Sequence, residues 1–180
     1  ENVIIEASSH GLHQERLHHI NFKSAVFTNF SQDHLDYHKN MKAYLNAKLI
    51  LFRKILRKKT KIISDKDILP FKILKKISKK RGLKLVDINN EFLKVKNQLP
   101  AFPDFKKKNL AMGILAAKIC GLKDHLIYGK IKKINDVNGR LELVKKFPNK
   151  VKVFLDYAHT PDALLKTLEY LKNENKNISI

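Results

Sequence analysis

The chain has a single cysteine and lacks long apolar runs and a secretory signal, the features that mark disulfide-rich, membrane-spanning and secreted proteins. Its 180 residues contain one cysteine, Cys120, so no disulfide can form within the chain and a reducing compartment is expected. No apolar run approaches the roughly 18 residues of a membrane span, and no basic segment followed by an apolar one indicates a secretory signal. We therefore expect no membrane insertion and a cytoplasmic location.

Acidic residues are also scarce, because 17 Asp and Glu oppose 37 Lys and Arg and leave a formal net charge of +20. Such a charge suggests a nucleic-acid partner. Between Arg53 and Lys84, however, the cations alternate with Ile and Leu, and the aromatic residues on which single strands stack do not cluster there. We therefore predict solvated basic helices, a modest attraction for phosphate-bearing ligands and no nucleic acid. A basic nucleic-acid-binding module is the alternative.

What the chain does have is an alternation of short apolar runs and amphipathic segments, which predicts an α/β fold with a mostly parallel sheet. Strands are expected at 2–6, 24–29, 61–64, 84–88, 92–96, 141–145 and 151–156. Helices are expected at 41–58, around Phe71, Leu74 and Ile77, at 107–120, at 124–134, and after Thr160 with Leu164, Leu165, Leu168 and Leu171 inward. A domain boundary is predicted near residue 139, which separates residues 1–138 from 139–180.

The predicted helix 41–58 carries a lysine among its apolar positions. Asn40 is a good N-cap, and the apolar residues after it repeat with the i, i+3, i+4 spacing of a core-facing stripe, namely Met41, Tyr44, Leu45, Leu49, Phe52 and Ile55. Lys48 falls inside this stripe. Desolvation there would favour the neutral amine, which can do chemistry that a solvated ammonium cannot. A side chain that extends to solvent is the structural alternative.

Three polar clusters follow predicted strands, at 6–10, 28–38 and 156–159. In open α/β sheets the ligand binds beyond the carboxyl ends of the strands, so these clusters are expected to form one site. Glu6, His34 and His38 are adequate ligands for a divalent cation. Alternatives remain open: Glu6 as a helix cap or ion-pair partner, and His34, His38 and Asp36 as the metal ligands of a zinc hydrolase. Asp156 and His159 are equally consistent with a tight turn.

Four longer motifs extend this interpretation: EASSHGLHQERL, AVFTNFSQDHLDYHKNMKAYLNAKLILF, NGRLELV and LDYAHTPDALLKTL. In these motifs the whole chain resembles the Mur ligases, and among them those that add the third amino acid to the peptidoglycan precursor. The resemblance implies the later part of a central ATP-binding domain over residues 1–138 and the start of a Rossmann-like C-terminal domain over 139–180. The related folylpolyglutamate synthetases share the architecture but not the SSHGL form of the first motif, and they are the alternative ligase.

The resemblance implies an ATP-dependent amide ligase. In this family ATP phosphorylates the terminal carboxylate of the nucleotide substrate, here UDP-N-acetylmuramoyl-dipeptide, and the amine of a free amino acid attacks the acyl phosphate. Diaminopimelate is favoured over lysine as that amino acid. The implied cofactors are ATP and Mg2+, and a monomer is expected.

The resemblance also implies roles for residues of this chain. Glu6, His34 and a carbamylated Lys48 would hold magnesium, and the carbamate forms only from a neutral amine. Ser8, Gln14 and Arg16 would bind the UDP substrate. The residues expected on the nucleotide side are Asn109, Arg140, Asp156 and His159.

The chain departs from the family pattern in three respects. The phosphate-binding GxxGKT loop is absent and is expected upstream of Glu1. The segment that selects the amino acid is expected beyond Ile180. Lys106 stands in the segment where relatives usually carry an asparagine, which leaves an inactive paralogue as a further alternative. We therefore expect an internal fragment that by itself neither hydrolyses ATP nor forms amide.

Overall fold

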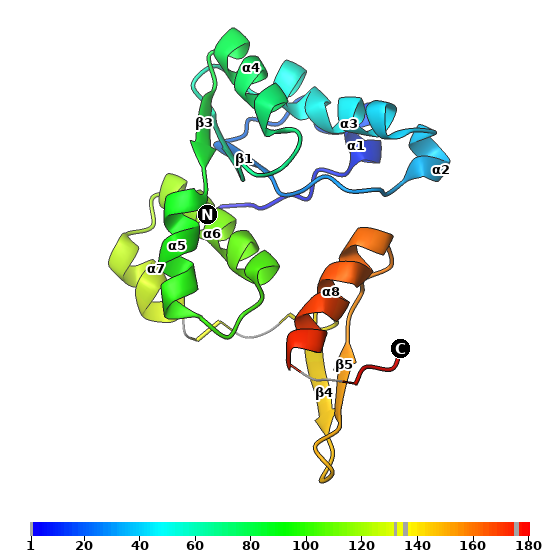
Figure 1. The fold of residues 1–180 in the computed structure, drawn as a ribbon. Helices are drawn as coiled ribbons and strands as arrows, with labels where there is room; N and C mark the ends of the chain where they lie inside the picture. The colour runs from blue at the N-terminus through cyan, green and yellow to red at the C-terminus, as the bar shows by residue number, and fades with distance from the viewer. Residues whose placement is uncertain (1, 132, 135–136, 175–176) are drawn as a thin grey trace. The chain divides into compact units, whose positions relative to one another are not determined.

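The structure is a computed structural model that describes residues 2–131, 133–134, 137–174 and 177–180 (Figure 1). The chain divides into two compact units. Unit 1 comprises Glu1–Phe30 and His34–Lys132, and unit 2 comprises Ser31–Asp33 and Lys133–Ile180. The domain boundary expected near residue 139 stays a prediction.

Unit 1 is built on a parallel sheet of three strands in the order β1-β2-β3. The strands are β1 (Ser24–Phe27), β2 (Lys61–Ser64) and β3 (Lys84–Asp87). Ile62 and Ile63 are both 0% exposed and belong to different core clusters. Because successive strand residues point to opposite faces, both faces of the sheet are covered. The predicted α/β class with a parallel sheet is confirmed.

The core cluster around Ile62 is formed with helices on one face of the sheet. These are α1 (Ser9–His13), α3 (Met41–Ile50), the π-helical turn η1 (Leu51–Ile55) and α4 (Phe71–Arg81); the short α2 (Leu35–His38) contacts α3. The Asn40 side chain accepts a hydrogen bond from Ala43 N at 2.9 Å, so the predicted N-cap is confirmed. The helix predicted to reach residue 58 ends at Ile55, after a turn in which Leu56 N donates to Leu51 O.

Three helices form the other core cluster around Ile63: α5 (Asn89–Gln98), α6 (Asp104–Ile119) and α7 (Asp124–Ile131). The strand predicted at 92–96 is wrong, because these residues lie within α5. Ile88, Phe92 and Val95 pack into this cluster at helical spacing. The segment FLKVK alternates polar and apolar residues, and such a short run fits both periods.

The strand predicted at 2–6 is also wrong. This segment forms no strand in the described part of the chain, and Val3 and Ile4 are 80% and 98% exposed. An apolar run becomes a buried strand only where a neighbouring strand satisfies its backbone and a helix covers its side chains. The described residues supply neither at this position.

Unit 2 contains β4 (Glu142–Lys146), β5 (Lys152–Leu155) and α8 (Pro161–Glu174). The two strands are antiparallel, because the connection between them is a short hairpin closed by Phe147 N donating to Val151 O at 2.8 Å. The helix predicted after Thr160 is confirmed as α8, and Thr160 Oγ1 caps it by accepting a hydrogen bond from Ala163 N at 3.4 Å.

The inward face predicted for α8 is wrong in part. Leu164 and Leu165 are 38% and 56% exposed, whereas Thr167 is buried. The described part of unit 2 offers only a two-stranded sheet, and so small a surface covers only part of a helix face.

None of the helices in the described part of the chain is both long and apolar enough to cross a membrane.

Candidate functional site

Helix α1 brings two predicted substrate-binding residues together around Gly11. Ser8 caps α1, and its Oγ accepts a hydrogen bond from Gly11 N at 3.1 Å. Arg16 N donates to Gly11 O at 3.0 Å. A Cβ placed on Gly11 would lie 3.2 Å from Ser8 Oγ and 3.9 Å from Arg16 Cδ, so both side chains flank the glycine. Gln14 is the C-cap of α1 and is exposed.

Six aromatic side chains from α1, α2, the α2 N-cap and α3 contact one another and form a group that we term the histidine–tyrosine cluster: His10, His13, His34, Tyr37, His38 and Tyr44. The ring centroids of His10 and His34 are 4.9 Å apart. His13 Nδ1 lies 3.0 Å from the Tyr37 hydroxyl. The cluster therefore joins the segment that holds Ser8 and Arg16 to the segment that holds His34.

His38 is the buried member of the cluster that ties α1 to α2. Its Nε2 lies 2.9 Å from Ser9 Oγ, and Ser9 is 1% exposed. Burial and the neighbouring His10, His13 and His34 lower the pKa of His38, although Asp36 opposes this. We therefore interpret His38 as a neutral imidazole that stabilises the fold through its contact with the buried Ser9 hydroxyl.

We expect His38→Ala to destabilise the fold by about 2 kcal/mol, because it removes a buried hydrogen bond and the ring that packs on Tyr44. Urea unfolding followed by circular dichroism measures this loss. His125→Ala, at an exposed position of α7, is the control and should be neutral. Equal effects of the two substitutions would contradict the structural role of His38.

Lys48 is half-buried on α3 rather than buried. Its Nζ lies 5.0 Å from the centroid of the Tyr44 ring, and the Tyr44 ring contacts both His34 and His38. Lys48 and His34 thus share Tyr44 as a neighbour, which agrees with the prediction that they belong to one site. The expected neutral amine and its carbamylation stay predictions.

Glu6 is the third predicted magnesium ligand, and its place in the site stays a prediction. It is exposed and makes no hydrogen bond or ion pair with a described residue. No three His, Cys, Asp or Glu side chains of the described residues are arranged to hold a metal ion. The zinc alternative finds no support, because His38, one member of the set His34, His38 and Asp36, directs its Nε2 at Ser9.

A hollow of about 440 Å³ lies at the carboxyl end of β1. Thr28 and Asn29, which follow the strand, line it together with Asn109, Met112 and Gly113 of α6. The structure therefore places Asn109, predicted on the nucleotide side, at the sheet edge where ligands of α/β proteins bind. Lys106 does not line this hollow, and its Nζ lies 5.9 Å from the Phe102 ring centroid.

The predicted nucleotide-side residues of unit 2 gather around Tyr157. The Arg140 guanidinium lies over the Tyr157 ring, with 4.8 Å between Cζ and the centroid. His159 contacts the same ring at 5.0 Å, and Asp156 Oδ1 accepts a hydrogen bond from Ala158 N at 2.7 Å. The local hydrogen bonds of Asp156 and His159 are compatible with the structural alternative considered for them, and their roles on the nucleotide side stay predictions.

A larger hollow of about 710 Å³ lies along the face of α3 opposite Lys48. It is lined by residues that include Ala43, Ala47, Ile50, Tyr37 and Arg53. His13, Tyr37 and His38 of the histidine–tyrosine cluster also line it, but Lys48, His34, Ser8 and Arg16 do not. We assign it no part in the site.

Sequence reasoning missed Tyr44, Tyr157 and Ser9 as parts of the site. Helical spacing assigns Tyr44 to the core stripe, yet it is the ring that Lys48, His34 and His38 share. Its position, four residues before Lys48, would have indicated this contact. The link between Ser9 and His38 spans 29 residues, and no local pattern signals it.

Comparison with known proteins shows which family the chain resembles in sequence. The profile of the Mur ligase middle domain matches residues 1–116. A protein of Wigglesworthia glossinidia brevipalpis named UDP-N-acetylmuramoyl-L-alanyl-D-glutamate--2,6-diaminopimelate ligase is 36% identical over 205 residues, which cover 98% of this chain and 40% of that protein. Proteins of the same name from Rickettsia conorii and Aquifex aeolicus are 34% and 36% identical over 96% and 98% of this chain.

The chain spans 40%, 40% and 39% of the length of these three relatives. The family profile covers all of β1, β2 and β3 and the residues around Gly11, Tyr44 and Asn109. The chain belongs to the Mur ligase family, through its middle domain.

Proposed function

We propose that the whole protein is an ATP-dependent amide ligase that joins diaminopimelate, as the third amino acid, to UDP-N-acetylmuramoyl-L-alanyl-D-glutamate in peptidoglycan synthesis. The observation that carries the proposal is the series of ring contacts from His10 of α1, through His34, to Tyr44 and Lys48, together with the position of Ser8 and Arg16 around Gly11, the residue after His10. It joins the predicted substrate residues to the predicted catalytic lysine. The named relatives support the same reaction.

In this proposal the residues of the chain bind and orient charged groups. Arg16 offers a guanidinium and Ser8 a hydroxyl to the UDP substrate. Asn109 and the other residues that line the hollow at the end of β1 bind a portion of the ATP molecule. Arg140, held by Tyr157, neutralises phosphate charge, and the turn of Asp156 and His159 keeps it in place.

The donor set suits magnesium only if Lys48 is carbamylated. His34 offers an imidazole and Glu6 a carboxylate, and a carbamate on Lys48 would supply the further oxygen ligand that the unmodified side chains lack. Magnesium bound by these three residues would neutralise phosphate charge during transfer to the carboxylate. Glu6 would then have to face His34; it is exposed on the extended segment before α1, in which the next residue, Ala7, packs against the core.

A cytoplasmic location and a monomeric state complete the proposal. The location is proposed from the lone Cys120, which is free and fits a reducing compartment. Single amide bonds form within one set of active-site residues, so no second copy is required.

The test is a chimera in which residues 1–180 replace the matching segment of the Aquifex aeolicus relative. We expect it to form the amide product with UDP-N-acetylmuramoyl-L-alanyl-D-glutamate, diaminopimelate, ATP and Mg2+, whereas residues 1–180 alone form none. Product is measured by chromatography and phosphate release by a coupled assay. A folded chimera that binds ATP but makes no amide would refute the proposed function.

Arg16→Ala in the chimera should raise the KM for the UDP substrate about 10- to 100-fold, because a charge-assisted contact to an anion is lost. The kcat should change little. His19→Ala, at an exposed position in the following loop, is the matched control. Arg16 would be removed from the site if both variants showed the same KM as the parent chimera.

A further inference from the structure

A lysine lies at the start of each parallel strand of unit 1, either as its first residue or directly before it. Lys23 directly precedes β1, Lys61 opens β2 and Lys84 opens β3. The register pairs Ser24 with Lys61 and Lys61 with Lys84, so these side chains share one edge of the sheet. It is the amino edge, opposite the one at which Thr28 and Asn109 line their hollow.

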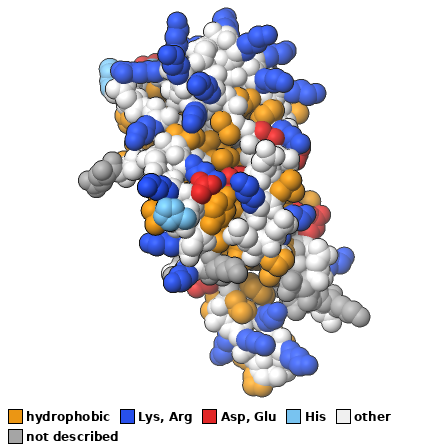
Figure 2. Space-filling view, turned by 90° about the vertical axis from the view of Figure 1, so that its left-hand side faces the viewer, with side chains coloured by type: hydrophobic (Ala, Val, Ile, Leu, Met, Phe, Trp, Pro, Cys, Tyr) orange, Lys and Arg blue, Asp and Glu red, His pale blue; other side chains and the backbone are white. Residues whose placement is uncertain are grey.

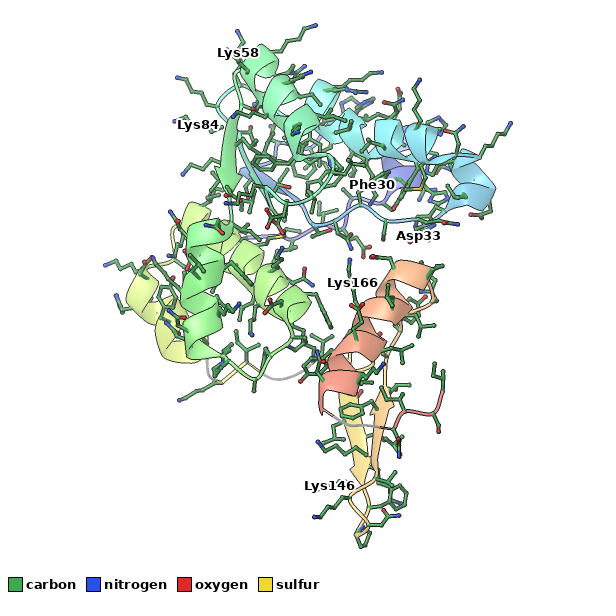
Figure 3. The ribbon with its side chains drawn as sticks, in the orientation of Figure 1. Phe30, Asp33, Lys58, Lys84, Lys146 and Lys166 are labelled. Atoms are coloured by element: carbon green, nitrogen blue, oxygen red, sulfur yellow. The ribbon has the colours of Figure 1, made fainter. Side chains whose placement is uncertain are left out.

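Two connections bring further cations to this edge. Lys59 N donates to Gly82 O at 2.7 Å, and a Cβ on Gly82 would lie 3.8 Å from Lys58 Cγ. Arg81 Nη2 donates to Leu56 O at 2.7 Å. We term the resulting surface the basic edge; it comprises Lys23, Arg57, Lys58, Lys59, Lys61, Lys79, Lys80, Arg81 and Lys84. Figure 3 shows Lys58 and Lys84 at this end of β3.

The basic edge is not neutralised by its surroundings. Residues 51–64 and 71–86 contain no Asp or Glu. No cation of the basic edge forms an ion pair within the part of the chain that the structure describes, and all except the half-buried Arg81 are exposed. Lys and Arg side chains crowd this upper end of unit 1 in Figure 2. Like charges so close together repel one another unless an anionic partner lies against them.

We propose that the basic edge holds the protein against an anionic phospholipid surface. Seven of the nine cations are lysines, compact charges that suit a diffuse negative potential rather than bidentate recognition. The Arg81 guanidinium donates hydrogen bonds to the backbone carbonyls of Lys54 and Leu56. Neither hollow described above includes a residue of the basic edge.

Two further observations favour a membrane surface over RNA. No exposed aromatic side chain occurs between residues 51 and 90, so bases have no ring on which to stack. Helix α4 turns its apolar side chains to the core, with Leu74 0% exposed, so the contact is electrostatic and does not insert. The predicted site at the carboxyl edge stays open while the amino edge is occupied. This inference is independent of the ligase proposal.

The test is sedimentation of residues 1–180 with vesicles of phosphatidylglycerol and phosphatidylcholine in equal parts, at about 0.05 M salt. Pure phosphatidylcholine vesicles and a fluorescent single-stranded RNA are the comparison ligands. The variant is Lys58→Gln/Lys61→Gln/Lys84→Gln. The matched control, Lys94→Gln/Lys123→Gln/Lys130→Gln, removes the same charge from exposed positions on α5 and α7 and before α7. Circular dichroism checks that each variant is folded.

We expect binding to the anionic vesicles that disappears at about 0.5 M salt, no binding to pure phosphatidylcholine, and at least about tenfold weaker binding for the basic-edge variant only. Three results would overturn the proposal: no binding to anionic vesicles, an equal loss in both variants, or tighter binding to RNA than to the vesicles. An equal loss would mean that only net charge matters.

Discussion

Lys48→Ala in the chimera is expected to lower the rate of amide formation by about a thousandfold or more, because the variant loses the anionic ligand that a carbamate would provide beside His34. The Tyr44 ring that Lys48 shares with His34 is 4% exposed and remains in place. The UDP-substrate KM should change little, because Ser8 and Arg16 lie around Gly11. Initial rates at varied substrate concentration separate the two effects.

A short carboxylate should partly restore the Lys48→Ala variant, because acetate or propionate can occupy the space of the missing carbamate. Lys42→Ala, at an exposed position of the same helix, is the control and should keep full activity. The carbamate itself is checked by a carbon-13 signal that appears when the protein is incubated with labelled bicarbonate and is lost in Lys48→Ala. Full activity of the Lys48→Ala variant would contradict the carbamate. So would the absence of the carbon-13 signal from the parent protein, even if Lys48→Ala were inactive.

The second large effect is expected from Lys108→Met. Asp65 follows β2 and is 4% exposed, and its Oδ2 accepts a hydrogen bond from Lys108 Nζ at 2.6 Å. Removing the ammonium leaves a buried carboxylate with one remaining hydrogen bond, from Asp67 N at 3.0 Å. We expect a loss of about 3 kcal/mol in the free energy of unfolding, measured by urea titration.

The same pair predicts an alkaline loss of stability. Burial lowers the pKa of Lys108, but the hydrogen bond and charge of Asp65, together with Asp67, outweigh it and raise the pKa above its ordinary value. A raised pKa in the folded state means that the stabilisation is complete below about pH 10 and disappears as the pH rises further. Lys108→Met should therefore flatten the alkaline part of the stability curve.

Two variants complete this test. Lys66→Met, at an exposed position beside Asp65, should leave the free energy of unfolding unchanged. Asp65→Asn combined with Lys108→Met should recover part of the loss, because no buried charge then lacks a partner. If the double variant were as unstable as Lys108→Met alone, the loss would have to come from packing.

The fold of unit 1 was predictable where local pattern and tertiary context agree. The short apolar runs at β1, β2 and β3 were identified by their near-continuous apolar character, although only β2 has buried side chains on both faces of the sheet. The segments 92–96 and 2–6 misled for different reasons. Residues 92–96 are too few for the spacing of their apolar residues to distinguish a helix from a strand. Residues 2–6 lack a neighbouring strand among the described residues.

The candidate site was predictable in its residues more than in its contacts. Motifs located Ser8, Arg16, His34 and Lys48, and the structure joins them through His10 and Tyr44. Glu6 is exposed and makes no hydrogen bond or ion pair with a described residue, so its place in the site rests on the motif alone. Ring contacts between distant segments depend on tertiary packing, which no spacing within one helix encodes.

The π-helical turn Leu51–Ile55 separates two halves of the segment that leads from the candidate site to β2. Each hydrogen bond there encloses one residue more than in an α-helix, so Leu51 and Phe52, adjacent in the chain, are both buried. A one-residue insertion or deletion in this turn would rotate the chain after Ile55 and leave α3 undisturbed. Homologues can therefore vary in length between α3 and β2 while the lysine on α3 keeps its orientation.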